Sequence, residues 1–360
     1  MRGPVKLGIV GVGNIAERHA QGYLAMPELA QIAAVADVLP AVARAKAEAW
    51  CAPRWFESLE AMLTHADIDA VDICLPHDLH VSAVQAAAAA GKHIYIEKPM
   101  GRTADECREM MAATSAAGVR LMVGHNLIFN PILQKAVSLV VVGYLGEVFM
   151  VRGASYGWPA FRPANYRLDG ARAGGGVLID TGVHLLYLMR AMGGEAHAVS
   201  ASTSHALRTE MEGEDNALLT IEYASGALGE AAASYATKLA TWQLGFPDGW
   251  DQRVEVYGSQ GTLKVDLIRG TLQVGVDAGR GIPELAEWRV GARGIGGSVE
   301  CALPNAYFDS FRYAVKGFVE SLLADAAPPV EAMDGFRVAQ MVDAAYESAR
   351  TGRKVAISEA

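Results

Sequence analysis

The chain has 360 residues, more than one hydrophobic core usually supports, so two domains are expected. Hydrophobic residues make up 51% of it and charged residues 20%, a composition typical of a folded protein without a low-complexity tail. Its 31 basic and 40 acidic residues give a formal net charge of −9, which argues against nucleic acid or an anionic membrane surface as the main partner.

Targeting signals and cysteine usage favour a cytoplasmic location. The start, MRGPVKLGIVGVG, has no cleavage-type small-residue site, so no signal peptide is expected. No stretch approaches the roughly 18 apolar residues that span a bilayer, so no membrane partner is expected. The four cysteines lie far apart without a C-x-x-C motif, as is typical of reduced thiols: Cys51, Cys74, Cys107 and Cys301.

Over the first 125 residues, short apolar β-rich runs alternate with Ala-rich stretches of helix length. Buried strands are expected within residues 6–12, 31–38, 70–75, 92–97 and 119–125. Helices are expected within residues 16–26, 81–91 and 104–118. This alternation predicts an α/β fold with a doubly wound parallel sheet, a Rossmann-type domain over residues 1–125.

Beyond Phe129 the pattern of strand and helix signals in the sequence changes. Segments of alternating or β-branched character follow one another with turn signals and little helix, at 146–156, 195–204, 215–226, 226–236, 253–266 and 270–277. They predict an α+β domain over residues 126–360 with a large, open and mostly antiparallel sheet. Two amphipathic helices close the chain within 308–325 and 334–352, the second with Asp334 as its N-cap and Gly352 at its end.

The first strand runs into a glycine motif, GIVGVGNIAERHA, which has the form G-x-G-x-x-A with Gly11, Gly13 and Ala16. The first glycine permits a tight turn, the second lets the backbone approach a pyrophosphate, and the small third residue lets helix and strand pack. The amides of the helix start, at Asn14 and Ile15, would then face the phosphates. The motif therefore predicts dinucleotide binding.

Asp37 ends the next predicted strand, about 20 residues further on, where a carboxylate accepts the hydroxyls of the adenosine ribose. A carboxylate repels the 2′-phosphate of NADP, and the residues that follow, Val38, Leu39 and Pro40, include no cation to receive it. NAD is therefore favoured over NADP.

Other strand ends of the first domain carry polar residues that are expected to line the same edge of the sheet, since ligands bind outside the carboxyl ends of parallel strands. One strand ends at Leu75 and Pro76, followed by His77 and His80 in the next turn and helix. Another ends at the charged pair Glu97 and Lys98, which unpaired burial inside the sheet would penalise. The last ends near His125 and Asn126, predicted to contact cofactor or substrate.

Together these segments resemble the family of glucose-fructose oxidoreductase and inositol 2-dehydrogenase, known as Gfo/Idh/MocA. The resemblance covers nearly the whole chain through an ordered set of segments: GVGNIAERH, CLPHDLH, GKHIYIEKP, GHNLIFNP, GYLGEVFMVR, GGGVLIDTGVHLL, VEVYGSQGTLKVD and DGFRVAQMVDAAYESARTGRKV. It implies an N-terminal NAD(P) domain and a C-terminal domain whose open sheet has a substrate-facing side and a subunit interface. It also implies oxidation or reduction of a secondary alcohol of a sugar, inositol or similar polyol.

The resemblance also implies roles for single residues. Lys98 is the expected catalytic lysine beside nicotinamide and substrate hydroxyl, and Glu97 is expected near the nicotinamide ribose. Asp180 and His184 match the family's Asp-x-x-x-His pair in the substrate pocket. The turn that contains Leu75, Pro76, His77 and His80 is expected to line the cofactor. A homodimer or homotetramer through the open face of the C-terminal sheet is expected.

Three positions depart from the family pattern. His77 stands where an Asn is usual, Ile128 where an Arg is common, and Tyr187 where many members have an Asp three residues past the catalytic histidine. Each departure concerns the substrate more than the reaction type.

Hydride transfer from a carbinol carbon requires a base for the hydroxyl proton and a group that stabilises the developing alkoxide. His184 suits a base at neutral pH, and Asp180, four residues earlier, could hold one tautomer of its imidazole. Lys98 could polarise the hydroxyl oxygen as an ammonium or, when desolvated, act as the base itself. His184 is favoured as base, but the sequence leaves both assignments open.

The segment from 155 to 176 is the candidate specificity loop, because it concentrates aromatic, amide and basic side chains before a run of three glycines. Trp158 and Tyr166 could stack on a sugar, and Arg167 could bind the carboxylate of a sugar acid. Gly174, Gly175 and Gly176 are expected to let the backbone pass close to a ligand and to start the helix that bears Asp180 and His184. No third metal ligand accompanies that pair, so no metal is expected.

The leading hypothesis is therefore an NAD-dependent sugar, inositol or sugar-acid dehydrogenase. Two alternatives remain open on the same fold: an enzyme that retains NAD and uses transient oxidation to cleave a glycoside or eliminate a group, and a non-catalytic sensor of sugar or dinucleotide. Net NADH formation would separate the first alternative, and a sensor has no need of a base such as His184.

Overall fold

A computed structural model describes residues 3–238, 250–276, 298–302 and 306–358, with backbone alone for 298–302 and 306. The chain divides into two compact units, one made of Met1–Asn126 with Phe311–Ala339 and the other of Leu127–Ser310 with Gln340–Ala360. Within the described residues, no helix combines the length and the apolar character needed to cross a membrane.

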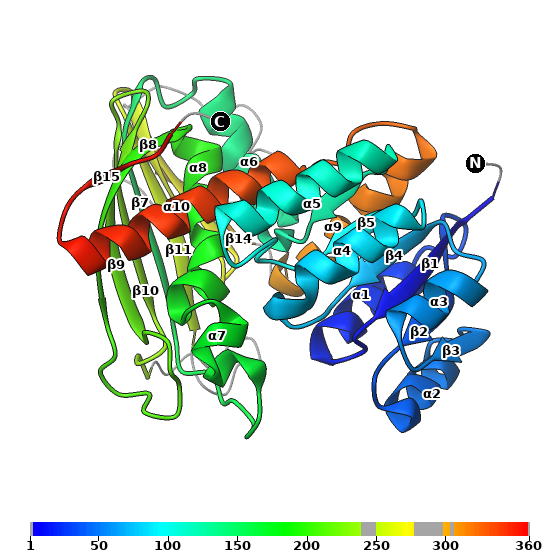
Figure 1. The fold of residues 1–360 in the computed structure, drawn as a ribbon. Coiled ribbons are helices and arrows are strands. Elements are labelled where there is room, and N and C mark those ends of the chain that lie inside the picture. The colour runs from blue at the N-terminus through cyan, green and yellow to red at the C-terminus, as the bar shows by residue number, and fades with distance from the viewer. Residues whose placement is uncertain (1–2, 239–249, 277–297, 303–305, 359–360) are drawn as a thin grey trace. The chain divides into compact units, whose positions relative to one another are not determined.

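The described part of the first unit is built on a six-stranded sheet in which all neighbours are parallel, in the order β3-β2-β1-β4-β5-β6 (Figure 1). The strands are β1 (Val5–Val10), β2 (Ala30–Ala36), β3 (Arg54–Phe56), β4 (Ala70–Ile73), β5 (His93–Ile96) and β6 (Leu121–Val123). This order is that of a doubly wound dinucleotide-binding sheet. The fold class expected for this half is confirmed.

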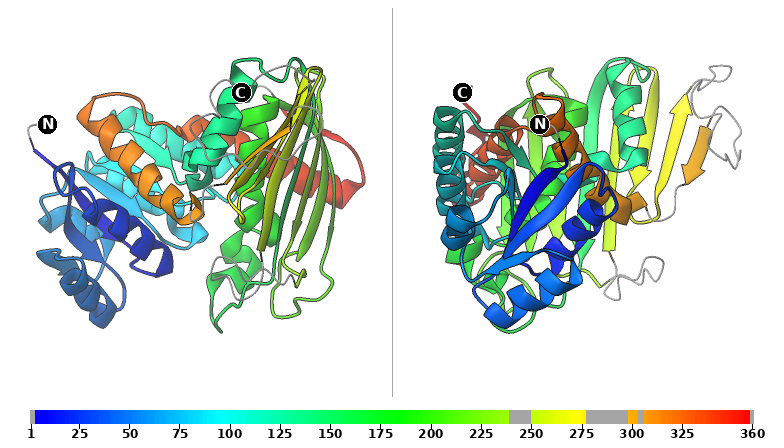
Figure 2. Two further views of the ribbon diagram at one scale, coloured as in Figure 1. Left: turned by 180° about the vertical axis from the view of Figure 1, so that it is seen from behind. Right: turned by 90° about the vertical axis from the view of Figure 1, so that its right-hand side faces the viewer.

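Five helices connect these strands: α1 (Asn14–Leu24), α2 (Pro40–Ala49), α3 (Leu59–His65), α4 (His80–Ala89) and α5 (Ala104–Ala117). The longest, α5, has a clear start and stop, because the side chain of Thr103 accepts the amide of Glu106 and Gly118 ends the helix in the left-handed conformation. Figure 2 shows α4 and α5 (teal) on one face of the sheet and α1 (dark blue) and α9 (orange) on the other.

The C-terminal part of the chain returns to the first unit. Phe318 of α9 (Ala306–Leu323) packs edge-on against Tyr95 of β5, with ring centroids 5.6 Å apart. The amide of Val123 donates to the carbonyl of Val330, just before α10 (Ala332–Thr351). The sequence pattern led us to expect a single domain boundary near residue 126. That boundary does not assign residues 311–339 to the first unit, where the structure has them.

The second unit contains a sheet with nine strands among the described residues, in the order β14-β13-β12-β11-β7-β10-β9-β8-β15. They are β7 (Val148–Gly157), β8 (Ala196–Ser204), β9 (Asn216–Tyr223), β10 (Leu228–Ser234), β11 (Trp250–Gly258), β12 (Gly261–Asp266), β13 (Thr271–Val276), β14 (Ser298–Ala302) and β15 (Val355–Ala356). Neighbours are antiparallel except β7 and β10, which pair in parallel. The mostly antiparallel sheet is thus confirmed.

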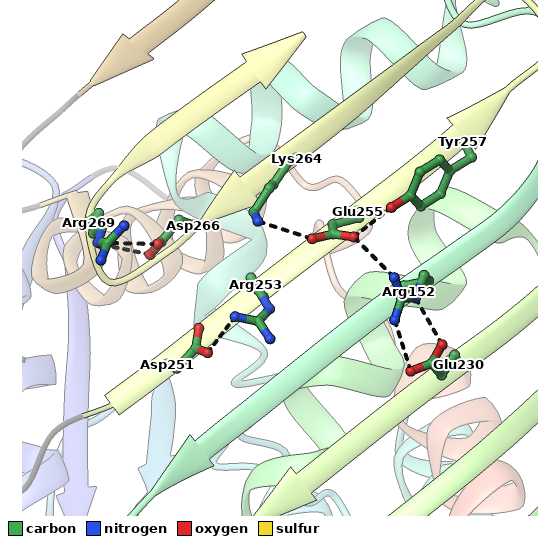
Figure 3. Close-up of polar contacts among 9 residues, drawn as sticks. All are labelled: Arg152, Glu230, Asp251, Arg253, Glu255, Tyr257, Lys264, Asp266 and Arg269. Atoms are coloured by element: carbon green, nitrogen blue, oxygen red, sulfur yellow. Dashed lines mark hydrogen bonds and ion pairs between the residues drawn. The ribbon is translucent and has the colours of Figure 1, made fainter. Parts of the chain in front are cut away.

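The two faces of this sheet differ. On the inner face, α8 (Val183–Gly193) packs so closely on β7 that a Cβ atom at Gly153 would overlap the side chain of Leu185. The opposite face carries charged side chains, because residues alternate along each strand (Figure 3). Cross-strand pairs there include Arg152 with Glu230 at 2.8 Å. This unit also contains α6 (Pro131–Val141) and the short α7 (Gly170–Ala173).

The start of α10 differs from the expected one. The helix begins at Ala332, so Asp334 is its third residue and not its N-cap. The Asp334 carboxylate instead accepts the backbone amide of Glu331, at 2.8 Å, as the third residue of a capping box does. Gly352, in the left-handed conformation, follows the helix end as expected.

Candidate functional site

The glycine loop after β1 contains two glycines that are required for different reasons. Gly11 has φ +79°, and a Cβ atom there would lie 2.5 Å from the carbonyl oxygen of Cys74. At Gly13 a Cβ atom would meet no protein atom within 4 Å, so the protein itself imposes no glycine there. Gly13 precedes α1 without a side-chain cap, which leaves the amides of Asn14 and Ile15 at the helix start available to an anion.

The Asp37 carboxylate lies beside this loop. Its Oδ2 accepts the amide of Val12 at 3.1 Å, and its Oδ1 accepts the amide of Leu39 at 2.9 Å. These bonds hold a carboxylate at the end of β2, next to the glycine turn at the end of β1. Val38 and Leu39 are exposed and apolar. The residues present therefore fit a dinucleotide whose adenosine ribose carries free hydroxyls.

His80 connects the turn after β4 to the segment after β5. Its Nε2 lies 3.0 Å from the carbonyl oxygen of Leu75, and its Nδ1 lies 3.0 Å from that of Pro99. Burial lowers the pKa of this imidazole despite the facing carbonyls. The ring of His77, also buried, lies edge-on to that of His80 at 5.8 Å. The His80 side chain thus supports the backbone of the turn that contains Pro76.

The candidate catalytic pair Glu97 and Lys98 follows β5 directly. Lys98 is half-buried, whereas the Glu97 carboxylate is buried and lies with Oε1 3.2 Å from Nε2 of His19. A Cβ atom at Gly124 would lie 2.9 Å from Glu97 Oε1, so a glycine after β6 makes room for this carboxylate. His125 and Asn126 follow Gly124 and are buried. Polar groups from five strand ends thus gather at one edge of the sheet.

In the second unit, Asp180 forms the centre of a hydrogen-bonded cluster. Its Oδ2 accepts Nε of Arg167 at 2.8 Å and the hydroxyl of Tyr235 at 2.6 Å. The Tyr235 hydroxyl also lies 2.7 Å from Oγ1 of Thr181. Burial and the charge of Asp180 raise the pKa of Tyr235, so its hydroxyl stays protonated and donates. The cluster holds a carboxylate in a fixed orientation.

Arg167 therefore has a partner within the protein. Burial opposes its charge, but the attraction of Asp180 outweighs burial and raises the pKa of the guanidinium. The guanidinium carbon also lies 4.7 Å from the ring centre of Tyr166. Arg167, Tyr166 and Asp180, all expected in the substrate pocket, are brought together by the structure.

Trp158 lies in a different, cationic environment. Its ring centre is 4.7 Å from the Arg208 guanidinium and 4.3 Å from the Lys238 ammonium. Arg208 is buried and donates to the carbonyl oxygens of Pro159 and Tyr235, so it links the chain next to Trp158 to the residue that follows β10. Neither Arg208 nor Tyr235 was predicted from the sequence as a site residue, and the one signal for Tyr235 is its position directly after β10.

The segment between the glycines and His184 is a π-helical turn, Leu178–Gly182, followed by α8 with the half-buried His184 in its first turn. Such turns occur often at functional sites. The Glu214 carboxylate holds its start, accepting the amides of Gly176 and Leu178, each at 2.9 Å. Burial raises the pKa of Glu214 against the effect of these bonds.

The glycine run is needed for packing within the protein. A Cβ atom at Gly176 would overlap the backbone of Glu214, and one at Gly175 would overlap the hydroxyl of Tyr346. Gly174, with φ +86°, ends α7 in the left-handed conformation. Packing within the protein therefore accounts for these glycines, and their expected close approach to a ligand remains a prediction.

Comparisons with known proteins agree with this architecture. Residues 5–125 match the family model described as "Oxidoreductase family, NAD-binding Rossmann fold", and residues 133–264 match the "GFO/IDH/MocA C-terminal domain". Inositol 2-dehydrogenase of Rhizobium meliloti is 28% identical, over 98% of this chain and 99% of its own. Levoglucosan dehydrogenase of Pseudarthrobacter phenanthrenivorans is 30% identical, over 64% and 67% respectively. The crystal structure of GenD2 from gentamicin A biosynthesis in complex with NAD superposes with a TM-score of 0.83 and 28% identity, covering 100% of this chain and 98% of that one.

Proposed function

The chain belongs to the Gfo/Idh/MocA family of oxidoreductases, and we propose that it transfers hydride between NAD and a secondary alcohol of a sugar, inositol or sugar acid. The observation that carries this proposal is the gathering of polar groups at the carboxyl ends of β1, β2, β4, β5 and β6. That edge is where doubly wound sheets bind nucleotides.

The cofactor would be held by residues from this edge. The open space at Gly13 and the uncapped amides of α1 suit a pyrophosphate, and the Asp37 carboxylate suits the adenosine ribose of NAD. Glu97, Asn126 and the backbone of the turn at Leu75–Pro76 would line the nicotinamide half. The buried side chains of His77 and His80 would support the backbone of that turn from the protein interior.

The reaction requires removal of a proton and of a hydride from the same carbinol. NAD, when bound, accepts the hydride. His184 would take the hydroxyl proton, and the Lys98 ammonium would stabilise the developing alkoxide. The half-buried state of both side chains suits groups that meet a substrate. In the converse assignment Lys98 would be the base, and Lys98→Arg, which keeps the charge but cannot give up a proton, would abolish turnover.

Asp180 would position the substrate and His184. Its orientation is supported by the bonds from Arg167 and Tyr235. The same bonds shift the proposed role of Arg167 from direct capture of a substrate carboxylate to support of Asp180. Trp158 and Tyr166 would provide aromatic surface for a sugar ring.

A panel of aldoses, inositols and sugar acids tested with NAD and NADP, with NADH formation followed by absorbance, tests the proposal. We expect turnover with NAD for at least one polyol class, and loss of at least a hundredfold in kcat for Lys98→Met and His184→Ala, the range of a lost acid–base group. Product without net NADH would instead support a cleaving or eliminating enzyme. Binding without turnover across the panel would support a sensor.

We also propose a homodimer or homotetramer formed through the charged face of the second sheet, in a cytoplasmic protein. The face is supported as an interface by its rows of alternating charge on β7, β10, β11 and β12, which a second copy of the face could pair with (Figure 3). Light scattering of the wild type against Arg152→Glu, a reversal on that face, tests the proposal. A monomeric wild type would contradict it.

A further inference from the structure

A carboxylate lies inside the first sheet, where parallel strands are normally apolar on both faces. Asp72, the third residue of β4, is fully buried, and an unpaired charge there would be very costly. Its Oδ2 lies 3.0 Å from Nδ1 of His19 and accepts the hydroxyl of Tyr23 at 2.9 Å. The Cys74 thiol donates to Oδ1 at 3.3 Å. Asp72 therefore provides a buried negative charge next to the His19 imidazole.

His19 joins this carboxylate to a second one. It lies on α1, the helix that begins at the glycine loop, and its Nε2 is 3.2 Å from Oε1 of Glu97. The N–H is not aligned for a hydrogen bond to Oε1, so this contact is an ion pair. A neutral imidazole has one N–H and could face only one carboxylate favourably, whereas an imidazolium has two. Its position between Asp72 and Glu97 therefore favours the charged form.

The other groups around the imidazole do not supply charge. Burial raises the pKa of the Cys74 thiol and of the Tyr95 and Tyr23 hydroxyls, so all three stay neutral at neutral pH. Tyr95 lies edge-on to the His19 ring at 5.2 Å, and Phe311 adds a further aromatic neighbour at 6.2 Å. The charged groups that face His19 are thus Asp72 and Glu97.

Asp72 contributes most to the charge of the imidazole. Burial alone would lower the pKa of His19, but the attraction and hydrogen bond of Asp72, together with the contact of Cys74, outweigh burial and raise the pKa well above the ordinary value. The buried pair of carboxylates is thereby compensated by one cation at neutral pH.

We infer that His19 is a positioning residue of the proposed dehydrogenase, whose imidazolium holds the Glu97 carboxylate in the orientation that meets the cofactor. Asp72 keeps the imidazole charged, and Gly124 leaves the space into which the carboxylate fits. His19 thereby links the helix at the glycine loop to the Glu97-Lys98 segment. The inference rests on the proposed cofactor role of Glu97.

A double-mutant cycle on NADH affinity tests the link. NADH binding to the full chain is measured by fluorescence for the wild type, His19→Gln, Glu97→Gln and the double variant. Each single substitution is expected to raise Kd by about tenfold or more, because each would disturb the hydrogen bond from the cofactor to the Glu97 carboxylate. The double variant is expected to match Glu97→Gln within about twofold, because His19 acts through Glu97. Additive losses would overturn the inference, since they would show that His19 acts on the helix alone.

The pH dependence provides a readout that a purely structural role would not change. In His19→Gln the cation next to Glu97 is lost and residue 19 no longer titrates, so the loss of affinity relative to the wild type is expected to be the same at pH 6 and at pH 8. In Asp72→Asn the imidazole keeps its place but loses its counter-charge, so it is neutral at pH 8. Its affinity is expected to recover in part as pH falls from 8 to 6, since the attraction of Glu97 still favours protonation of the imidazole. Equal slopes for the two variants would overturn the inference.

Tyr23→Phe is the matched control, because it removes a hydrogen bond to Asp72 and leaves every charge in place. It is expected to bind NADH within about twofold of the wild type at both pH values.

Thermal unfolding checks that each variant folds. If His19→Gln does not fold, the pH dependence of NADH affinity in Asp72→Asn alone decides. Stoichiometric metal in the purified protein would also overturn the inference, because His19, Asp72 and Cys74 place ligand atoms within 4.8 Å of one another. NADH binding needs no substrate, so a failure of the sugar panel would refute the proposed function and leave this test intact.

Discussion

Gly13→Ala is expected to weaken cofactor binding while leaving the fold stable. A Cβ atom at Gly13 meets no protein atom within 4 Å, and the backbone there has φ −78°, which alanine adopts readily. The change in the free energy of unfolding should therefore stay below about 1 kcal/mol, the range of a helix N-cap substitution. A pyrophosphate against this backbone would meet the new methyl group. Overpacking of about 1–3 kcal/mol corresponds to roughly 5- to 150-fold in Kd.

Gly11→Ala is the matched comparison two residues away. There φ is +79° and the new Cβ atom would lie 2.5 Å from the carbonyl oxygen of Cys74, so alanine should cost about 2–5 kcal/mol of stability even without cofactor. Thermal unfolding and NADH fluorescence titration of both variants separate the two effects. If Gly13→Ala bound NADH as tightly as the wild type, the pyrophosphate would not approach this loop and the assignment of the cofactor site would be refuted.

Three further substitutions test the second unit. Tyr235→Phe removes the donor that lies 2.6 Å from Asp180, and kcat/KM for the best substrate should fall about tenfold or more, with unchanged values contradicting a role for the cluster. Gly176→Ala should lower the melting temperature by several degrees, because its Cβ atom would overlap the Glu214 backbone; a melting temperature like that of the wild type would contradict this packing. Asp215 accepts three backbone amides, and despite burial these bonds lower its pKa below 3.8. Its stabilisation is present above about pH 4 and lost as pH falls through the lower folded value, so the melting-temperature difference between wild type and Asp215→Asn should shrink in acid rather than stay constant.

Much of the first unit could be predicted because its signals are local. Each buried parallel strand is a continuous apolar run, and the residue that follows it necessarily lies at the carboxyl edge of the sheet. Asp37 and Glu97 were selected on that ground, and the structure has both at strand ends. The start of α10 was misplaced by three residues, because an acid can serve a helix start as the cap or as the third residue of a capping box.

Pairing between segments that are distant in the chain was harder to predict from the sequence. The parallel pairing of β7 with β10 joins strands about 80 residues apart, and nothing in either strand's alternation specifies the direction of its neighbour. The return of residues 311–339 to the first unit depends on contacts such as Phe318 with Tyr95, between segments more than 200 residues apart. Amphipathic periodicity shows that a helix buries one face, but it does not identify what covers that face.

The sequence by itself determined the dinucleotide sheet, its glycine turn and the residues at its carboxyl edge, because these depend on spacing within a few residues of each strand. Only the tertiary structure decided what surrounds the acidic residues. Asp180 is held by Tyr235 from 55 positions away, and the glycines before it make room for Glu214. His19 lies in the helix that follows the glycine loop. Asp72 stabilises the charged form of its imidazole, and Glu97 lies on the other side of the ring. The ionisation of a buried group depends on partners that the fold brings together, and those partners have no fixed spacing in the chain.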